Sequence, residues 1–265
     1  MTLVDGKKIA QEIANVVTKD VSTLGFKPTM MVFACEPNFE TQKYLALKKA
    51  KAEALGIGLE VVLLPKQSTT AEVVSVIKGA VPKTNGIVVQ LPLPVQIDTE
   101  AVLAAVPASH DVDAFNYRYG KSSVLPPVVG AIAEISKVHQ LDWKNKQVVI
   151  FGSGRLVGTP ALIYAKKLGA IVTVISEKTK DVSQLTQAAD IIILGVGKAN
   201  LLTFDMVKDG VAVFDAGASE DGGLLVGDAS RDVAEKASLF TPVPGGIGPI
   251  TIALLFRNLI ELVRQ

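Results

Sequence analysis

The chain has 265 residues, of which 49% are hydrophobic and 20% charged, so it is long enough for two domains and general disorder is excluded. Lysine and arginine number 27 against 26 aspartate and glutamate residues, which gives no reason to expect nucleic acid or an anionic membrane as a partner. One cysteine, Cys35, and two histidines exclude an internal disulfide and a zinc cluster, so we expect no metal and a small-molecule partner.

The amino-terminal segment MTLVDGKKIAQEI is polar from Asp5 onward and has no apolar stretch of signal-peptide length. The longest uncharged run, residues 241–256, is interrupted by proline and glycine and is shorter than the roughly 20 residues that a membrane helix needs. We therefore expect a soluble, cytoplasmic protein without a membrane segment.

The first half of the chain alternates between short apolar runs and segments with helical spacing of apolar residues. Such an alternation predicts a parallel α/β unit. In chain order it comprises a helix over 9–21, a strand over 30–35, a helix over 41–55, a strand over 58–65, a helix that opens with a capping box at Thr69 and Glu72, and a strand over 86–90.

An irregular stretch over 107–127 precedes the second half, and we place a domain boundary at its carboxyl end. After a connecting helix at about 129–139, four apolar runs of parallel-strand type follow, with the sequences VVIFG, IVTVIS, DIIILGVG and VAVFDAG. A last helix over 250–263 packs back on the first domain in this prediction, because chain termini often lie close together.

A glycine-rich segment joins the first of these runs to an amphipathic helix. Gly152, Gly154 and Gly158 remove Cβ atoms where backbone N–H groups and the start of a helix can approach a pyrophosphate. The alternative is a tight strand-to-helix turn without a ligand, but the strand before and the helix after favour a dinucleotide site. The predicted coenzyme-binding residues of this loop are Gly152, Ser153, Gly154, Arg155 and Gly158.

The next strand ends in Ser176, Glu177 and Lys178, where the adenosine ribose is normally recognised. Glu177 can accept a hydrogen bond from a ribose 2′-hydroxyl and repel a 2′-phosphate, whereas Lys178 and Arg155 can neutralise that phosphate. These residues leave NAD and NADP both open, and solvated surface charges are the alternative interpretation.

Two features of the first domain suggest chemistry. Tyr44 and Lys48 are four residues apart on a predicted helix, so their side chains meet on one face, as they also do in ordinary exposed pairs. Gln90 ends a buried strand at the edge where open α/β sheets place ligand-binding groups, and Leu91 and the following prolines turn the chain away; a capping glutamine is the alternative.

Collinear motifs along the whole chain resemble one enzyme family. Residues 41–48 resemble its S-x-x-Y-x-x-x-K helix, and GIVVQLPLP and HDVDAF resemble its next two signatures. GSGRLVGTP, GLLVGDA and TPVPGGIGPIT resemble three more in the second half. The chain is thereby similar to the bifunctional methylenetetrahydrofolate dehydrogenase/methenyltetrahydrofolate cyclohydrolases of FolD type.

The resemblance implies oxidation of 5,10-methylenetetrahydrofolate with NADP or NAD, followed by hydrolysis of the methenyl product to 10-formyltetrahydrofolate. It implies a fold of two α/β domains with an active-site cleft between them: a catalytic domain over 1–125 with the C-terminal helix 248–265, and a Rossmann-type doubly wound parallel sheet over 126–247. It also implies a homodimer, with contacts through strands of the second domain, and a place in one-carbon metabolism and purine biosynthesis.

Residue roles follow by family match. Lys48 corresponds to the catalytic lysine, a base if burial lowers its pKa, and Gln90 to the residue that tunes it. Tyr44 would stack on the folate and Asp113 would bind the amino-pyrimidine edge of the pterin. The predicted catalytic residues are Lys48, Tyr44, Gln90 and Asp113, and the predicted folate contacts add Leu91, Pro244, Gly245 and Gly246.

Four positions depart from the family motifs: His110, Ala114, Ser153 and Glu177. Ser153 replaces an arginine that helps to hold the 2′-phosphate, and LPPVVG at 125–130 lacks the usual polar residues near the coenzyme. The departures weaken the expectation of NADP specificity. They leave two alternatives: a cyclohydrolase with weak or lost dehydrogenase activity, and a non-catalytic NAD(P)-binding regulatory module.

Overall fold

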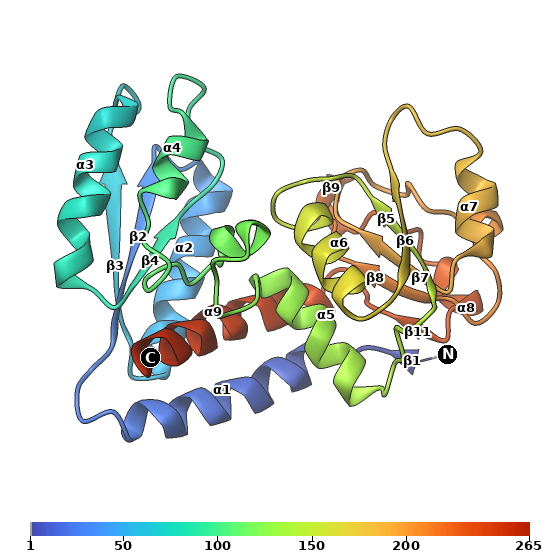
Figure 1. The fold of residues 1–265 in the computed structure, drawn as a ribbon, viewed down its shortest axis with the longest axis horizontal. Helices are drawn as coiled ribbons and strands as arrows, with labels where there is room; N and C mark the ends of the chain where they lie inside the picture. Colours follow the sequence, from blue (N-terminus) through green and yellow to red (C-terminus); the bar gives the residue numbers. More distant parts are fainter. Residues whose placement is uncertain (1) are drawn as a thin grey trace. The chain divides into compact units, whose positions relative to one another are not determined.

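A computed structural model describes residues 2–265, except for the side chains of Phe39, Glu40 and Lys43. The chain forms two compact units (Figure 1). Unit 1 comprises the chain up to Gln11 together with Pro126–Thr251, and unit 2 comprises Glu12–Leu125 together with Ile252–Gln265. The helices α1 (Gly6–Ser22) and α9 (Ile247–Val263) each contribute residues to both units.

Unit 2 contains a parallel sheet of three strands in the order β3-β2-β4. Its strands are β2 (Thr29–Cys35), β3 (Gly58–Leu64) and β4 (Gly86–Val89). They alternate with the helices α2 (Phe39–Ala54), α3 (Thr70–Ala80) and α4 (Thr99–Ala104), and with the short 3-10 turns Val81–Lys83 and Phe115–Tyr119. The strand-helix alternation predicted for the first half is confirmed, as is the capping box at Thr69 and Glu72.

The two faces of this sheet pack against different helices. Alternate residues of β2 and β4, including Phe33 and Ile87, form one core with α3 and α4. The opposite face meets α9: a Cβ on Gly86 would lie 2.6 Å from Leu259 Cδ1. Asn258 of α9 donates from Nδ2 to the carbonyl oxygens of Val112 and Leu125 at 2.8 and 2.9 Å. The last helix therefore packs on the three-stranded sheet and also holds the segment between Val112 and Leu125 by hydrogen bonds.

Unit 1 contains a parallel sheet of six strands in the order β1-β11-β8-β7-β5-β6. The strands are β1 (Thr2–Leu3), β5 (Gln147–Phe151), β6 (Ile171–Ile175), β7 (Ile191–Leu194), β8 (Ala212–Asp215) and β11 (Leu239–Phe240). The helices are α5 (Pro127–Val138), α6 (Gly158–Lys167), α7 (Val182–Ala188) and α8 (Val233–Lys236), with a 3-10 turn at Phe204–Met206. A hairpin of β9 (Ser219–Asp221) and β10 (Leu224–Val226) follows β8.

The four predicted apolar strands are confirmed, and their order is that of a doubly wound sheet. One face packs Val149, Ile192 and Val213 against the α7 and α8 side, and Trp143 stacks on Phe214 at a centroid distance of 5.9 Å. The first residues of the chain lie in unit 1 and not in the first domain as expected from the sequence, because β1 pairs with β11. A two-residue strand carries no periodicity that would have indicated this pairing.

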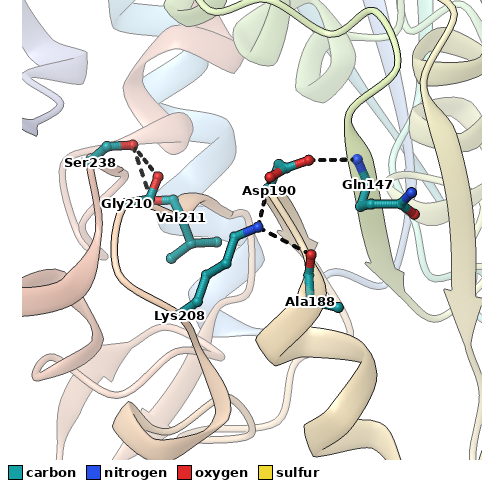
Figure 2. Close-up of polar contacts among 7 residues, drawn as sticks. All are labelled: Gln147, Ala188, Asp190, Lys208, Gly210, Val211 and Ser238. Atoms are coloured by element: carbon teal, nitrogen blue, oxygen red, sulfur yellow. Dashed lines mark hydrogen bonds and ion pairs between the residues drawn. The ribbon is translucent and has the colours of Figure 1, made fainter.

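A carboxylate ties together the amino ends of two strands of this sheet. Asp190, directly before β7, accepts a hydrogen bond from the first N–H of β5, that of Gln147, at 2.9 Å, and Lys208 Nζ donates to the same carboxylate at 2.7 Å (Figure 2). Lys208 also donates to the carbonyl oxygen of Ala188. Among the described residues, no helix is long and apolar enough to cross a membrane.

Candidate functional site

Helix α2 carries Tyr44 and Lys48 on one face. The helix begins where Asn38 Oδ1 accepts from the N–H of Thr41 at 2.9 Å, a standard N-cap. Lys48 is 6% exposed although it is a lysine, whereas Tyr44 is 39% exposed. The ammonium nitrogen of Lys48 lies 4.7 Å from the centroid of the Tyr44 ring. The helix thus presents a buried amine beside an accessible aromatic ring.

Gln90 brings the end of a strand to this amine. Lys48 Nζ donates to Gln90 Oε1 at 3.2 Å, and Gln90 Nε2 donates to the carbonyl oxygen of Leu91 at 3.1 Å, which fixes the orientation of the amide. Gln90 follows β4, and its backbone N–H still pairs with Phe33 of β2 at 2.8 Å. The backbone ladder therefore sets the position of Gln90, and Gln90 sets that of the Lys48 amine.

Asp111 forms an isolated parallel bridge with Ile87 of β4, and Asp113 lies on the loop directly after this bridge. The Asp111 carboxylate is buried and accepts from the N–H and Nδ2 of Asn116 at 2.9 and 3.0 Å, which shapes the turn around Asp113. Ala114, where the family motif has glycine, adopts the left-handed region with a φ of 55°. This conformation accounts for the glycine of the motif.

Burial and charge shift the pKa values of this group in a coupled way. Burial lowers the pKa of Lys48, and the nearby Asp113 charge opposes that fall. Burial raises the pKa of Asp113 to about 6; Lys48 lowers it, whereas Asp111 adds to the rise. A lysine whose pKa is lowered and a carboxyl group whose pKa is raised to about 6 can exchange protons with a substrate.

The glycine-rich turn of unit 1 connects β5 to α6. Gly152 has a φ of +77° and its N–H pairs with Ile175 of β6 at 2.8 Å. A Cβ on Gly158 would collide with the carbonyl oxygen of Gly152, whereas a Cβ on Gly154 would have no neighbour within 4 Å. The turn is therefore tightly packed at Gly158 but has open space at Gly154, just before α6 begins. These residues fit a dinucleotide pyrophosphate.

The end of β6 forms a short hydrogen-bonded turn. The N–H of Ser176 donates to Thr179 Oγ1 at 2.9 Å, and the N–H of Lys178 donates to Ser176 Oγ at 3.3 Å. Glu177 and Lys178 are both exposed at the tip of this turn, and Ser153 of the glycine-rich turn is exposed as well. Arg155 is half-buried.

Pro244, Gly245 and Gly246 lie in unit 1, directly before α9. The N–H of Gly6 donates to the carbonyl oxygen of Gly245 at 3.0 Å, and a Cβ on Gly6 would collide with the carbonyl oxygen of Gly246. The structure therefore brings together Tyr44, Lys48, Gln90 and Asp113 within unit 2, and it places the predicted coenzyme residues and the 244–246 segment within unit 1.

Two buried aspartates of unit 1, Asp215 and Asp228, were not expected from the sequence to be functional. Burial raises the pKa of Asp215 to about 6, although backbone N–H groups that donate to it oppose the rise. The signal in the sequence that could have indicated them is an aspartate at the end of an apolar run and close to a glycine, as in VAVFDAG and GLLVGDA. Within the described part of the chain, no three histidine, cysteine or acidic side chains are grouped to hold a metal ion.

A doubly wound parallel sheet with a glycine-rich turn in one unit, and a buried lysine in a second α/β unit, define a two-domain enzyme with a dinucleotide-binding domain. Residues 126–265 match the family model of the tetrahydrofolate dehydrogenase/cyclohydrolase NAD(P)-binding domain, and residues 4–113 match that of the catalytic domain. The chain belongs to the tetrahydrofolate dehydrogenase/cyclohydrolase family and is an enzyme of that bifunctional class.

Relatives match over nearly their full lengths. The bifunctional protein FolD of Nautilia profundicola is 38% identical, with 100% of this chain and 98% of the relative covered. The crystal structure of the bifunctional FolD enzyme from Campylobacter jejuni has a TM-score of 0.94 at 35% identity and covers 100% of this chain and 99% of its own. The FolD structure from Trypanosoma brucei, complexed with NADP cofactor and inhibitor, has a TM-score of 0.90 at 29% identity and covers 99% of this chain and 97% of its own.

Proposed function

We propose that this chain oxidises 5,10-methylenetetrahydrofolate with a nicotinamide dinucleotide and hydrolyses the methenyl product to 10-formyltetrahydrofolate. The observation that carries the proposal is the buried amine of Lys48, held by Gln90 at 3.2 Å beside the exposed ring of Tyr44. The family match of both halves of the chain supports the same two activities.

Hydrolysis requires that a proton leaves the attacking water. Burial lowers the pKa of Lys48 and so increases the fraction of neutral amine available as a base. In the proposed step the neutral amine takes the water proton as the carbon–oxygen bond forms at the methenyl carbon. The hydroxyl on that carbon then gives up its proton as the formyl carbonyl forms, and the ring nitrogen takes up a proton as the carbon–nitrogen bond breaks, which releases the formyl product.

Tyr44 and Asp113 are the proposed folate contacts in unit 2. The Tyr44 ring is accessible enough to stack on a flat pterin. The Asp113 carboxylate can accept two hydrogen bonds from an amino-pyrimidine edge, and the ionised form is needed for both. Leu91 and the segment Pro244–Gly246 complete the proposed set of folate contacts.

The proposed coenzyme residues are those of the glycine-rich turn and of the turn after β6. When bound, a nicotinamide ring accepts the hydride that leaves the folate. Gly154 leaves room for the pyrophosphate beside the start of α6, where the N–H of Thr159 already donates to the carbonyl oxygen of Gly154 at 3.0 Å. We propose that NADP binds but is poorly discriminated from NAD, because Ser153 offers no guanidinium group and Glu177 is exposed beside the expected ribose position.

The proposal includes a homodimer in the cytoplasm that serves one-carbon metabolism and purine biosynthesis, and the family resemblance supports these parts. Sedimentation equilibrium tests the dimer. A monomer across the micromolar range would contradict it.

Hydrolysis of methenyltetrahydrofolate without any coenzyme tests the role of Lys48. Lys48→Met should leave less than about 1% of the hydrolysis rate, because the base is lost, while NADP binding stays normal. Lys48→Arg keeps a positive charge but cannot deprotonate near neutral pH, so it should be equally inactive. Substantial hydrolysis by either variant would contradict the assignment. Turnover of methylenetetrahydrofolate with NADP and NAD, measured side by side, tests the dehydrogenase half.

A further inference from the structure

Three successive backbone N–H groups after β7 donate to one buried carboxylate. The N–H groups of Val196 and Gly197 donate to Asp228 Oδ2 at 2.7 and 3.2 Å, and that of Lys198 donates to Oδ1 at 2.7 Å. Asp228 is 0% exposed, whereas residues 196–198 expose their outer side to solvent. Consecutive N–H groups of this kind ordinarily form a concave anion-binding site. Here the buried carboxylate of Asp228 occupies that site from the interior of the unit.

A second aspartate holds Asp228 in place. Asp215, the last residue of β8, accepts from the N–H groups of Asp228 and Ala229 at 3.1 and 2.8 Å and from that of Gly217 at 2.9 Å. A Cβ on Gly217 would collide with the Asp228 carboxyl group, and a Cβ on Gly227 would collide with that of Asp215. Both glycines are therefore needed for the carboxylates to reach their donors.

The loop held by Asp228 lies where an open α/β sheet binds its ligand. β7 pairs with β5 on the side opposite β6, so the carboxyl ends of β5 and β7 form the switch point of the sheet. A Cβ on Gly152 would lie 2.7 Å from Val196 Cγ1, and one on Gly195 would lie 2.7 Å from Val157. The 195–198 loop thus packs directly against the glycine-rich turn.

We infer that Asp228, held by Asp215, is a positioning residue for the nicotinamide coenzyme and acts through the 195–198 loop. The inference rests on the proposed dehydrogenase function. Because Asp228 occupies the N–H groups of residues 196–198, the backbone of this loop offers a ligand no anion site. The phosphates are then left to the glycine-rich turn, and an uncharged part of the coenzyme, a ribose or the nicotinamide, lies against the loop.

The test is Asp228→Asn, with Asp190→Asn as the matched control. An asparagine has one acceptor oxygen, and its NH₂ group opposes a backbone N–H of the loop, so the loop should lose its shape. The control removes a carboxylate that also accepts a strand N–H, but at the amino ends of β5 and β7, the edge opposite the switch point (Figure 2). Asp190 lies outside the proposed catalytic and binding residues.

Asp228→Asn should raise the Kd and the KM for NADP and NAD alike by about tenfold or more, and change hydrolysis of methenyltetrahydrofolate without coenzyme by less than about twofold. Asp190→Asn should leave both Kd values within about twofold of the parent, whatever its effect on thermal stability. Parent affinity in Asp228→Asn, an equal loss in Asp190→Asn, or an equal loss of hydrolysis would overturn the inference.

Amide hydrogen exchange of the parent tests the inference even if Asp228→Asn does not fold. The amides of residues 196–198 should exchange slowly without coenzyme, because Asp228 already binds them; rapid exchange would overturn the inference. A parent that binds coenzyme while Asp228→Asn behaves normally contradicts this inference alone. A parent that binds neither NADP nor NAD overturns the proposed dehydrogenase function and the inference together.

Discussion

Gln90 accepts a hydrogen bond from Lys48 Nζ at 3.2 Å, although 42 residues separate the two side chains in the sequence. Gln90 Nε2 is bound to the carbonyl oxygen of Leu91, so the amide cannot easily turn its nitrogen towards the amine. A neutral Lys48 amine that donates to Gln90 keeps its lone pair directed away from the Gln90 oxygen.

Gln90→Glu should place a negative charge next to Lys48 and raise the pKa of the amine. At neutral pH less neutral base would be available, so coenzyme-free hydrolysis should fall by about tenfold or more and recover as the pH is raised. Gln90→Met is the matched control, because it removes the hydrogen bond without adding charge. Its rate should fall without a shift of the pH profile; identical profiles in the two variants would show that Gln90 does not tune Lys48.

Asp113 should impose a pH dependence on folate binding. Burial raises the pKa of Asp113 to about 6, so kcat/KM for the folate should rise between about pH 5 and 7 as the carboxylate forms. Asp113→Asn should show a lower value without that rise. The comparison needs coenzyme Kd as a control, since Asp113→Asn should leave it unchanged; a parallel loss of both would indicate misfolding.

Ionisation of Asp113 should also affect stability: folate binding should rise with pH, whereas the stability of the folded state should fall. The folded pKa of Asp113 lies above the ordinary value of 3.8, so its ionisation disfavours the native state as the pH rises from about 4 to 6. Asp113→Asn should therefore gain stability over the parent, on the order of 2 kcal/mol, at pH 8 relative to pH 4. Urea unfolding at the two pH values measures this difference, and a constant difference would contradict it.

Gly154→Ala should weaken coenzyme binding without disturbing the fold. A Cβ there meets no atom within 4 Å, so thermal stability should stay close to that of the parent, while a bound pyrophosphate would meet the new methyl group. Gly158→Ala is the contrast, because its Cβ would collide with the carbonyl oxygen of Gly152 and should lower stability as well. Unchanged coenzyme Kd in Gly154→Ala would place the pyrophosphate elsewhere.

Glu177→Ser should shift the ratio of kcat/KM values towards NADP. Glu177 is exposed directly after Ser176 at the end of β6, and removing its charge relieves repulsion of a 2′-phosphate by roughly 1 kcal/mol, or about fivefold in the ratio. Glu235→Ser, which removes an exposed glutamate from α8 of the same unit, is the control and should leave the ratio unmoved. A hundredfold NADP preference in the parent, or equal ratios in all three proteins, would show that Glu177 does not contact the adenosine ribose.

Several features were determined by the sequence alone, because they depend on neighbouring residues. Strands such as 30–35 and 86–90 and the capping box at Thr69 follow from local periodicity and local hydrogen bonds. The glycine-rich turn between a strand and a helix is likewise a local pattern. The pairing of Tyr44 with Lys48 follows from helical spacing.

Only the tertiary structure decided which distant segments meet. The contact between Lys48 and Gln90 depends on β4 lying beside β2, and no local pattern specifies that neighbour. The three hydrogen bonds that Asp228 accepts from residues 196–198 likewise depend on which strand ends lie together at the edge of the sheet. Local patterns set the elements because short-range hydrogen bonds form within a few residues, whereas burial of a lysine or an aspartate is set by the strands and helices that pack around it.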